Sequence, residues 1–124
     1  MRPLMDMNLS SHATRIDPVT AQALQRFLAR VGQRYRTRGA VLYGSRARGD
    51  HRPDSDADVM VLLEGEHQRF VATKLAMTDL AYEVLLETGL YISALPVWTD
   101  EWEHPERWSN PALLRHIARE GVPL

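Results

Sequence analysis

The segment DADVMVLL, residues 56–63, places the tightest constraint on the fold, because its last five residues are all apolar. Continuous apolar runs of this length are typical of a β-strand that is covered on both faces. Two further runs, AVLY at residues 40–43 and LYISALPVW at residues 90–98, predict two more short strands. The chain is therefore expected to build a small sheet with a buried interior.

The segments between and around these strands show the apolar spacing of helices. Asp17 and Pro18 begin the first predicted helix as its N-cap and first helical residue, and Gly39 is expected to end this element. A second helix is predicted over residues 67–87, and a third over residues 109–121, where a polar cap, a proline and a final glycine mark its bounds. The order helix, strand, strand, helix, strand, helix predicts an α/β (α+β) fold, a small mixed β-sheet flanked by helices.

Length and composition predict one domain, because the chain has 124 residues, of which 44% are apolar and 25% charged. We expect residues 1–16 to form a flexible N-terminal arm and residues 17–124 a single domain. The net charge of -1 argues against direct binding of nucleic acid. The lack of cysteine excludes disulfides and thiolate metal sites and fits a cytoplasmic protein, and no segment predicts a signal peptide or a membrane span.

Gly44 and Ser45 directly follow the first predicted strand. Glycine lets a ligand approach the backbone closely. If residues 45–48 form a helical turn, the unpaired amides near Ser45 and its hydroxyl can receive phosphate oxygens. A turn of this kind more often serves structure alone. It is not a P-loop, because Asp50 and His51 stand where a lysine and a serine or threonine are required.

Asp56 and Asp58 lie two residues apart at the start of the second predicted strand. Alternate side chains of a strand point to the same face, so both carboxylates are expected side by side and would repel each other. A magnesium ion, which prefers carboxylate oxygens together with substrate phosphates, resolves this repulsion, and a solvated start of a strand is the structural alternative. The combination favours magnesium and nucleotide, because ten residues separate Ser45 from Asp56 and the two strands are expected to be neighbours.

The stretch GSRARGDHRPDSDADVMV, residues 44–61, resembles the signature of minimal nucleotidyltransferases in the polymerase-beta superfamily, of the type that act as antitoxins to HEPN-domain toxins. The matching residues are Gly44, Ser45, Arg48, Gly49, Ser55, Asp56 and Asp58. The predicted order of elements is similar as well, so the resemblance covers most of the chain after the N-terminal arm. It implies a polymerase-beta-like nucleotidyltransferase fold.

The resemblance also implies roles for individual residues. They are Mg²⁺ binding and catalysis by Asp56 and Asp58, and nucleotide binding by Gly44, Ser45, Arg46, Arg48 and Ser55. Arg46 and Arg48 suit phosphate contacts and suit solvated helix positions equally well. The implied reaction is attack of a hydroxyl on the α-phosphorus of a nucleoside triphosphate, expected to be ATP, with release of pyrophosphate.

The chain departs from the family pattern at one place. Full members carry a third carboxylate on a later strand, but the expected strand here, YISALPVW, contains no acid, and Ser93 stands roughly at that position. Asp100 and Glu101 follow the strand and are expected to lie out of reach. Oxygens of the substrate, Asp54 or a carboxylate of a partner could complete the metal site, and the sequence leaves these three sources open.

Three functions remain open. The first is an antitoxin of the type VII kind that transfers AMP from ATP to a tyrosine hydroxyl of a HEPN-family RNase toxin, because so short a chain has no room for a separate substrate domain. The second is a nucleotide-binding antitoxin that acts by occlusion, and the third is a nucleotidyltransferase for small molecules such as antibiotics. An oligomer or a complex with the partner protein is compatible with the first two.

Three tryptophans, Trp98, Trp102 and Trp108, follow one another late in the sequence. Such a group is expected to pack the C-terminal helix onto the core. A surface for a partner is the alternative, because aromatic side chains are enriched at the centres of interfaces.

Overall fold

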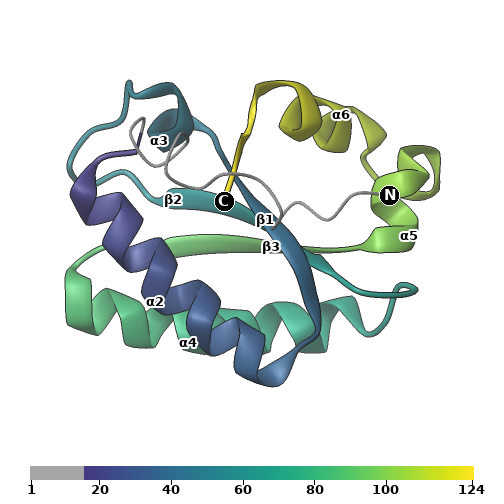
Figure 1. Ribbon diagram of the computed structural model, residues 1–124, viewed down its shortest axis with the longest axis horizontal. Coiled ribbons are helices and arrows are strands. Elements are labelled where there is room, and N and C mark those ends of the chain that lie inside the picture. Colours follow the sequence, from purple (N-terminus) through teal and green to yellow (C-terminus); the bar gives the residue numbers. More distant parts are fainter. Residues whose placement is uncertain (1–15) are drawn as a thin grey trace.

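The computed structural model describes residues 16–124. The N-terminal arm expected over residues 1–16 therefore lies outside the described residues except for Ile16, which is buried in the core. The chain forms α2 (Pro18–Arg34), β1 (Thr37–Tyr43), α3 (Ser45–Arg48), β2 (Ala57–Leu63), α4 (Phe70–Thr88), β3 (Ile92–Trp98), α5 (Thr99–Glu103), a 3₁₀ turn (Pro105–Arg107), α6 (Pro111–Glu120) and β4 (Val122–Pro123). Figure 1 shows the strands in the middle and the helices on both sides of them.

The four strands form one mixed sheet in the order β3-β2-β1-β4. β1 is antiparallel to both β2 and β4, whereas β2 and β3 are parallel. This register sets Asp58 opposite Tyr43 on β1 and opposite Ser93 on β3. The predicted α/β class with a small mixed sheet flanked by helices is confirmed.

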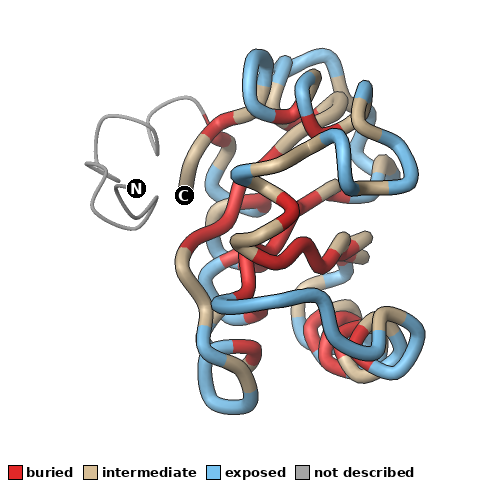
Figure 2. Tube along the Cα trace, turned by 90° about the vertical axis from the view of Figure 1, so that its right-hand side faces the viewer, coloured by how far each residue is buried: buried red, intermediate tan, exposed pale blue. Residues whose placement is uncertain are grey.

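Alternate residues of β2 enter two different cores. Val59 and Val61 pack with side chains of α2 and α4 on one face of the sheet, and Met60 and Leu62 pack with side chains of α6 on the other. All four of these side chains are fully buried, and Figure 2 shows buried residues concentrated along the strands. The prediction that this strand is covered on both faces is therefore correct.

The predicted start of the first helix is confirmed, because Asp17 caps α2 through a 2.9 Å hydrogen bond from the Thr20 amide and Pro18 is its first residue. The predicted end is wrong. α2 ends at Arg34, and Gly39 lies inside β1, next to a bulge that shifts the register against β2. A glycine within a strand often marks such a bulge, so it was not a helix stop here.

The prediction for the tryptophans holds in part. Trp102 and Trp108 pack against the core beneath α6, as expected, but Trp98 belongs to the core on the opposite face of the sheet. The three rings therefore do not form one cluster. The sequence did not predict α5 or β4 either, and β4 adds an edge strand of only two residues. Within residues 16–124, no helix is long and apolar enough to cross a membrane.

Candidate functional site

The turn after β1 brings its backbone against a carboxylate of β2. Gly44 has φ of 75°, in the left-handed region that disfavours side chains, and it directly precedes the short helix α3. A Cβ atom at position 44 would lie 2.5 Å from Oδ2 of Asp58. Only glycine therefore lets this turn lie so close to Asp58.

The first turn of α3 leaves donors for a ligand. The amides of Ala47 and Arg48 both donate to the Gly44 carbonyl at 3.1 Å. The amides of Ser45 and Arg46 come before this first backbone bond, and amides at the start of a helical turn have no partner within the helix. Together with the Ser45 hydroxyl, they are suitable donors to an anion that lies at the turn.

The two aspartates predicted from the sequence both lie at the start of β2. Asp56 is exposed and Asp58 is half-buried. Burial raises the pKa of the Asp58 carboxyl, and the negative charge of Asp56 raises it further, while Lys74 and Arg48 act in the opposite direction. The Tyr43 hydroxyl opposite Asp58 also resists ionisation, because burial and the charge of Asp58 raise its pKa to about 12. Lys74 and Arg48 therefore offset the negative charge at this end of the sheet only in part.

Lys74 is a charged neighbour of this site that sequence reasoning missed. It lies near the start of α4, is half-buried, and its ammonium donates a hydrogen bond to the carbonyl oxygen of Ala94, the residue after Ser93. Burial lowers the pKa of Lys74, whereas the negative charge of Asp58 raises it. The sequence signal that could have identified this residue is a lysine within a helical pattern that is otherwise mostly apolar.

Arg46 serves the structure of the loop between β1 and β2. Its side chain is only 3% exposed. Its guanidinium donates to the Thr20 hydroxyl at 2.8 Å and to the carbonyls of Ser55, Pro53 and Arg52 at 2.9, 3.1 and 3.3 Å. Because these acceptors already occupy its donors, Arg46 fixes the loop that leads to Asp56 and has little left to offer a phosphate.

Arg48 and Ser55, which the sequence also predicts to bind nucleotide, have fewer partners within the protein than Arg46. The Arg48 side chain is 56% exposed, and its Nε atom lies 3.1 Å from Oδ2 of Asp50, a pair that water screens strongly. Its charge also acts on Asp58. Arg48 is thus free to exchange Asp50 for a phosphate. The Ser55 hydroxyl accepts a hydrogen bond from the Arg52 amide at 2.9 Å and so shapes the turn before Asp56.

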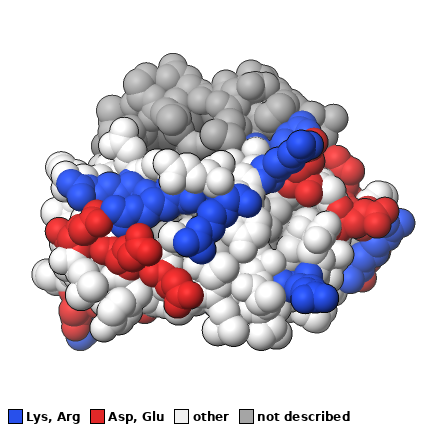
Figure 3. All heavy atoms as spheres, turned by 90° about the horizontal axis from the view of Figure 1, so that it is seen from below, with Lys and Arg blue, Asp and Glu red and all other residues white. Residues whose placement is uncertain are grey.

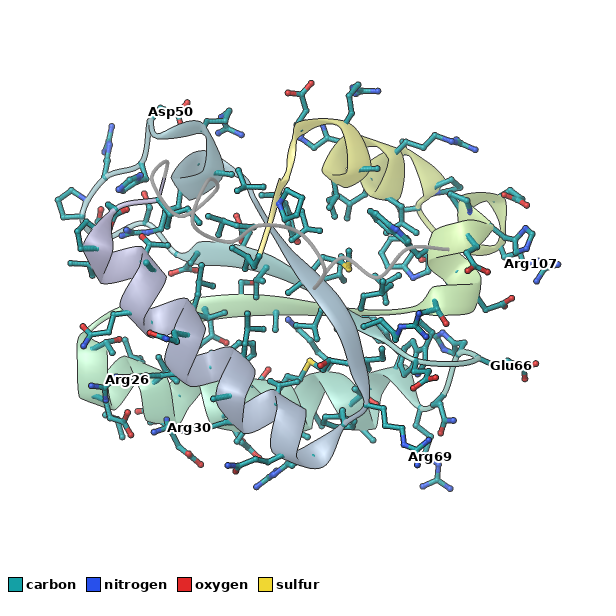
Figure 4. The ribbon with its side chains drawn as sticks, in the orientation of Figure 1. Arg26, Arg30, Asp50, Glu66, Arg69 and Arg107 are labelled. Carbon is teal, nitrogen blue, oxygen red and sulfur yellow. The ribbon has the colours of Figure 1, made fainter. Side chains whose placement is uncertain are left out.

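Asp100 and Glu101 lie at the end of the sheet away from Asp56 and Asp58, as expected. Ser93 is the residue of β3 opposite Asp58, while Asp100 and Glu101 follow the far end of that strand, about 17 Å away along β3 at the usual rise per residue. Figure 4 shows these two ends, with Asp50 near α3 and Arg107 near α5. Glu101 is buried and binds His67 Nδ1 at 2.9 Å.

A cavity of about 490 Å³ lies beside Glu101 and His67 and is lined in part by Phe70 and Trp108. Its position separates it from the carboxylates at the start of β2. Within residues 16–124, no group of three or more histidine or acidic side chains is placed to hold a metal ion. Asp56 and Asp58 therefore stand as a pair without a third protein carboxylate.

The pair nevertheless fits a divalent cation. Two neighbouring carboxylates, one of them half-buried and with a raised pKa, are stabilised by a hard cation. Because Gly44 has no side chain, the Asp58 carboxylate is open on the side that faces the turn. Magnesium commonly keeps several water ligands and takes others from substrate phosphates, so two protein carboxylates can suffice.

Comparison with known proteins identifies the family of the chain. Residues 24–114 match the family model of the nucleotidyltransferase domain. One similar solved structure is that of a candidate nucleotidyltransferase from Sulfolobus solfataricus, which has 15% sequence identity and a TM-score of 0.49 over 91% of this chain and 82% of that chain. No curated protein matches the chain in sequence. Because the family model spans most of the chain, including both aspartates and the turn at Gly44, the protein belongs to the nucleotidyltransferase domain family.

Proposed function

We propose that the chain is a magnesium-dependent nucleotidyltransferase that moves AMP from ATP to a tyrosine hydroxyl of a HEPN-type RNase toxin and acts as the antitoxin of that pair. The close approach of Gly44 to Asp58 supports the nucleotide and magnesium part of this proposal, since a Cβ atom at position 44 would lie 2.5 Å from the carboxylate. A shared site for triphosphate and metal requires this closeness between the turn after β1 and the start of β2.

Each residue of the site has a task in this proposal. The amides of Ser45 and Arg46 and the Ser45 hydroxyl bind phosphate oxygens, and the exposed Arg48 adds a positive charge. Asp56 and Asp58 would hold magnesium. When bound, magnesium neutralises charge on the phosphates and helps to align them.

The reaction forms a bond between the acceptor oxygen and the α-phosphorus of ATP. The bond from the α-phosphorus to the oxygen that bridges to the β-phosphate breaks, and pyrophosphate leaves with the electron pair. The acceptor hydroxyl gives up its proton to a solvent water molecule. A protein acceptor suits this site because docking holds the hydroxyl in line with the α-phosphorus and removes much of the entropic barrier.

One observation favours a second function, a nucleotide-binding antitoxin that occludes its partner without turnover. Ser93 is paired with Asp58 in the sheet, at the place where the resemblance calls for a third carboxylate. A serine hydroxyl binds magnesium less strongly than a carboxylate, so this site has a weaker hold on a catalytic metal than a three-carboxylate site.

The test is mass spectrometry of a HEPN-type RNase toxin that is co-expressed with this chain. We expect an added AMP on a tyrosine with the wild-type chain and none with Asp56→Asn/Asp58→Asn. The matched control is Glu66→Gln/Glu106→Gln, which removes two exposed charges distant from the site and should leave the modification intact.

Other outcomes separate the alternatives. If the double aspartate variant still protects cells and no AMP is ever found, occlusion is the mechanism and the transferase proposal is wrong. Transfer of AMP to an aminoglycoside, with the co-expressed toxin unmodified, would show a small-molecule enzyme instead.

A further inference from the structure

Lys74 is the only lysine among the fifteen lysine and arginine residues of the chain. Arginine presents a planar fork of donors, whereas lysine carries a compact charge on a flexible stem. Arginines of α2 pair with acids of α4, Arg26 with Glu87 at 2.9 Å and Arg30 with Glu83 at 3.7 Å. Figure 3 shows basic and acidic side chains in neighbouring bands on this side of the molecule. Lys74, in contrast, takes part in no ion pair among the described residues.

The Lys74 ammonium lies at the free edge of the sheet. α4 covers the face of the sheet opposite to Asp58, and the half-buried Lys74 side chain reaches the edge that the two faces share. There it donates a hydrogen bond to the carbonyl oxygen of Ala94 on the edge strand β3. An ammonium has three hydrogens, and no second hydrogen-bond acceptor for Lys74 lies among the described residues. Lys74 can therefore bind a further group at this edge.

The register of the sheet sets Lys74 and the turn at Gly44 on opposite sides of Asp58. Asp58 is paired with Tyr43 of β1 and with Ser93 of β3. Gly44 follows Tyr43, whereas Lys74 binds the residue after Ser93. Burial raises the pKa of Asp58 and lowers the pKa of Lys74, and the charge of each group opposes the shift of the other. Asp58 thus lies between the donors predicted to bind phosphate and the Lys74 ammonium.

The direction of the transfer reaction makes the β3 side of Asp58 the side of the acceptor. An in-line displacement needs the acceptor oxygen on the side of the α-phosphorus opposite to the leaving pyrophosphate. When the β- and γ-phosphates lie at the Gly44 turn, on the β1 side of Asp58, the acceptor hydroxyl approaches from the β3 side. Ser93 has no charge to offer there, and the third carboxylate of the family pattern is missing. Lys74 is the positive charge that the fold sets on this side.

We propose that the Lys74 ammonium binds the acceptor hydroxyl of the transfer reaction on the β3 side of Asp58 and stabilises the negative charge that develops on its oxygen. Lys74 thus supplies positive charge where a third carboxylate would hold a further metal ion. The ammonium keeps its protons, and the proton of the acceptor passes to water, as in the reaction above. This proposal rests on the proposed transfer of AMP, but it holds for any hydroxyl acceptor.

A purely structural role for Lys74 leads to different expectations. Lysines near edge strands protect the edge from pairing with another chain, and the bond to Ala94 ties α4 to β3. In that role, replacement of Lys74 changes stability or aggregation and leaves the kcat of the folded protein unchanged. The two roles therefore differ in their effect on the chemical step.

The first experiment measures the transfer of AMP to a HEPN-type RNase toxin with purified proteins. Lys74→Met should lower kcat about a hundredfold, which is the usual effect of removing one donor to a developing oxyanion. The affinity for ATP with magnesium should stay close to that of wild type, because the phosphates lie on the other side of Asp58. Lys74→Arg keeps the charge and should retain at least about a tenth of the wild-type kcat.

The matched control is Arg69→Met. This variant also removes a positive charge near the start of α4, but Arg69 is exposed, and Figure 4 shows its side chain pointing away from the sheet. It should leave kcat and the affinity for ATP unchanged.

An NMR measurement keeps the result independent of activity. Because Lys74 is the only lysine, incorporation of ¹³C-labelled lysine gives one ε-methylene signal, which belongs to this residue. Magnesium with α,β-methylene-ATP, which cannot transfer AMP, should shift this signal in wild type and not in Asp56→Asn/Asp58→Asn. Addition of the toxin to the wild-type complex should shift the signal further, because the acceptor hydroxyl then reaches the ammonium.

The contrary results can be told apart. A wild-type kcat in folded Lys74→Met overturns the role of Lys74 and leaves the proposed function standing. A ¹³C signal that does not respond to the bound analogue also overturns it, because the ammonium then lies outside the site, and this signal decides the matter if Lys74→Met does not fold. If the wild-type chain binds ATP but modifies no HEPN-type toxin, the proposed function fails, and the role of Lys74 toward its acceptor fails with it.

Discussion

Acidic side chains at the two ends of the sheet differ in whether they have partners within the protein. Beyond the end of β3, the buried Glu101 accepts hydrogen bonds from both His67 and the Trp98 amide, at 2.9 and 3.1 Å. At the start of β2, no ion pair among the described residues includes Asp56 or Asp58, although Asp58 is half-buried and its pKa is raised.

This difference separates acids that serve the fold from acids that cost it stability. A buried carboxylate with two partners holds its surroundings together. A half-buried carboxylate beside a second one is unfavourable until a cation arrives, and such perturbed groups gather at functional sites. Arg46 shows that the end of the sheet with Asp56 and Asp58 also contains a structural charge, because its guanidinium is fully used within the protein.

The largest effect on stability is expected from Arg46→Met. The change removes a buried charge and leaves several carbonyl acceptors without partners, so the free energy of unfolding should fall by about 3 kcal/mol. Arg48→Met, only two residues away, should change it by less than about 0.5 kcal/mol because that side chain is exposed. Urea denaturation checks both. Equal losses in the free energy of unfolding would contradict the assignment of a structural role to Arg46 and not to Arg48.

A smaller loss is expected at the far end from Glu101→Ala. The variant leaves the Trp98 amide and His67 without their buried acceptor, which should lower the free energy of unfolding by about 1–3 kcal/mol. ATP affinity, measured by calorimetry at a temperature where the variant is folded, should not change. A loss of ATP binding in this variant would mean that the two ends of the sheet are not independent.

The smallest effect is a gain in stability for Asp58→Asn without magnesium, and it depends on pH. Burial and the charge of Asp56 raise the pKa of Asp58 in the folded state, so the folded protein holds that proton more tightly than the unfolded chain. The stabilisation from this group is present below the ordinary pKa of aspartate and is lost as the pH rises through the raised value. The variant should therefore melt at a higher temperature than wild type at neutral pH.

The pH series itself is the control for this prediction. The difference in melting temperature between Asp58→Asn and wild type should shrink to zero as the pH falls below the usual aspartate range near about 4. Addition of magnesium should stabilise wild type and not the variant. A variant that is less stable than wild type at neutral pH would show that Asp58 serves the fold.

Much of this fold could be predicted from the sequence, because its signals are local. Asp17 and Pro18 mark the start of α2, and the continuous apolar run of β2 requires cover on both faces. The spacing between Ser45 and Asp56 indicated one shared site, and the register of β2 against β3 puts Ser93 opposite Asp58, where the missing carboxylate was expected.

The remaining features depend on tertiary contacts that no local pattern encodes. Arg46 and Arg48 are equivalent as sequence, and only the carbonyls of the folded loop distinguish them. Lys74 comes near Asp58 through the packing of α4 on β3, across sixteen residues of chain.

The most direct test of the central claim is calorimetric titration of ATP in the presence of magnesium into wild type and into Asp56→Asn/Asp58→Asn. The account predicts magnesium-dependent binding by wild type and a loss of at least about a hundredfold, or about 2.7 kcal/mol, in the double variant. Thermal unfolding should show that the variant is folded. ATP binding of equal affinity in the two proteins would contradict the assignment of the site.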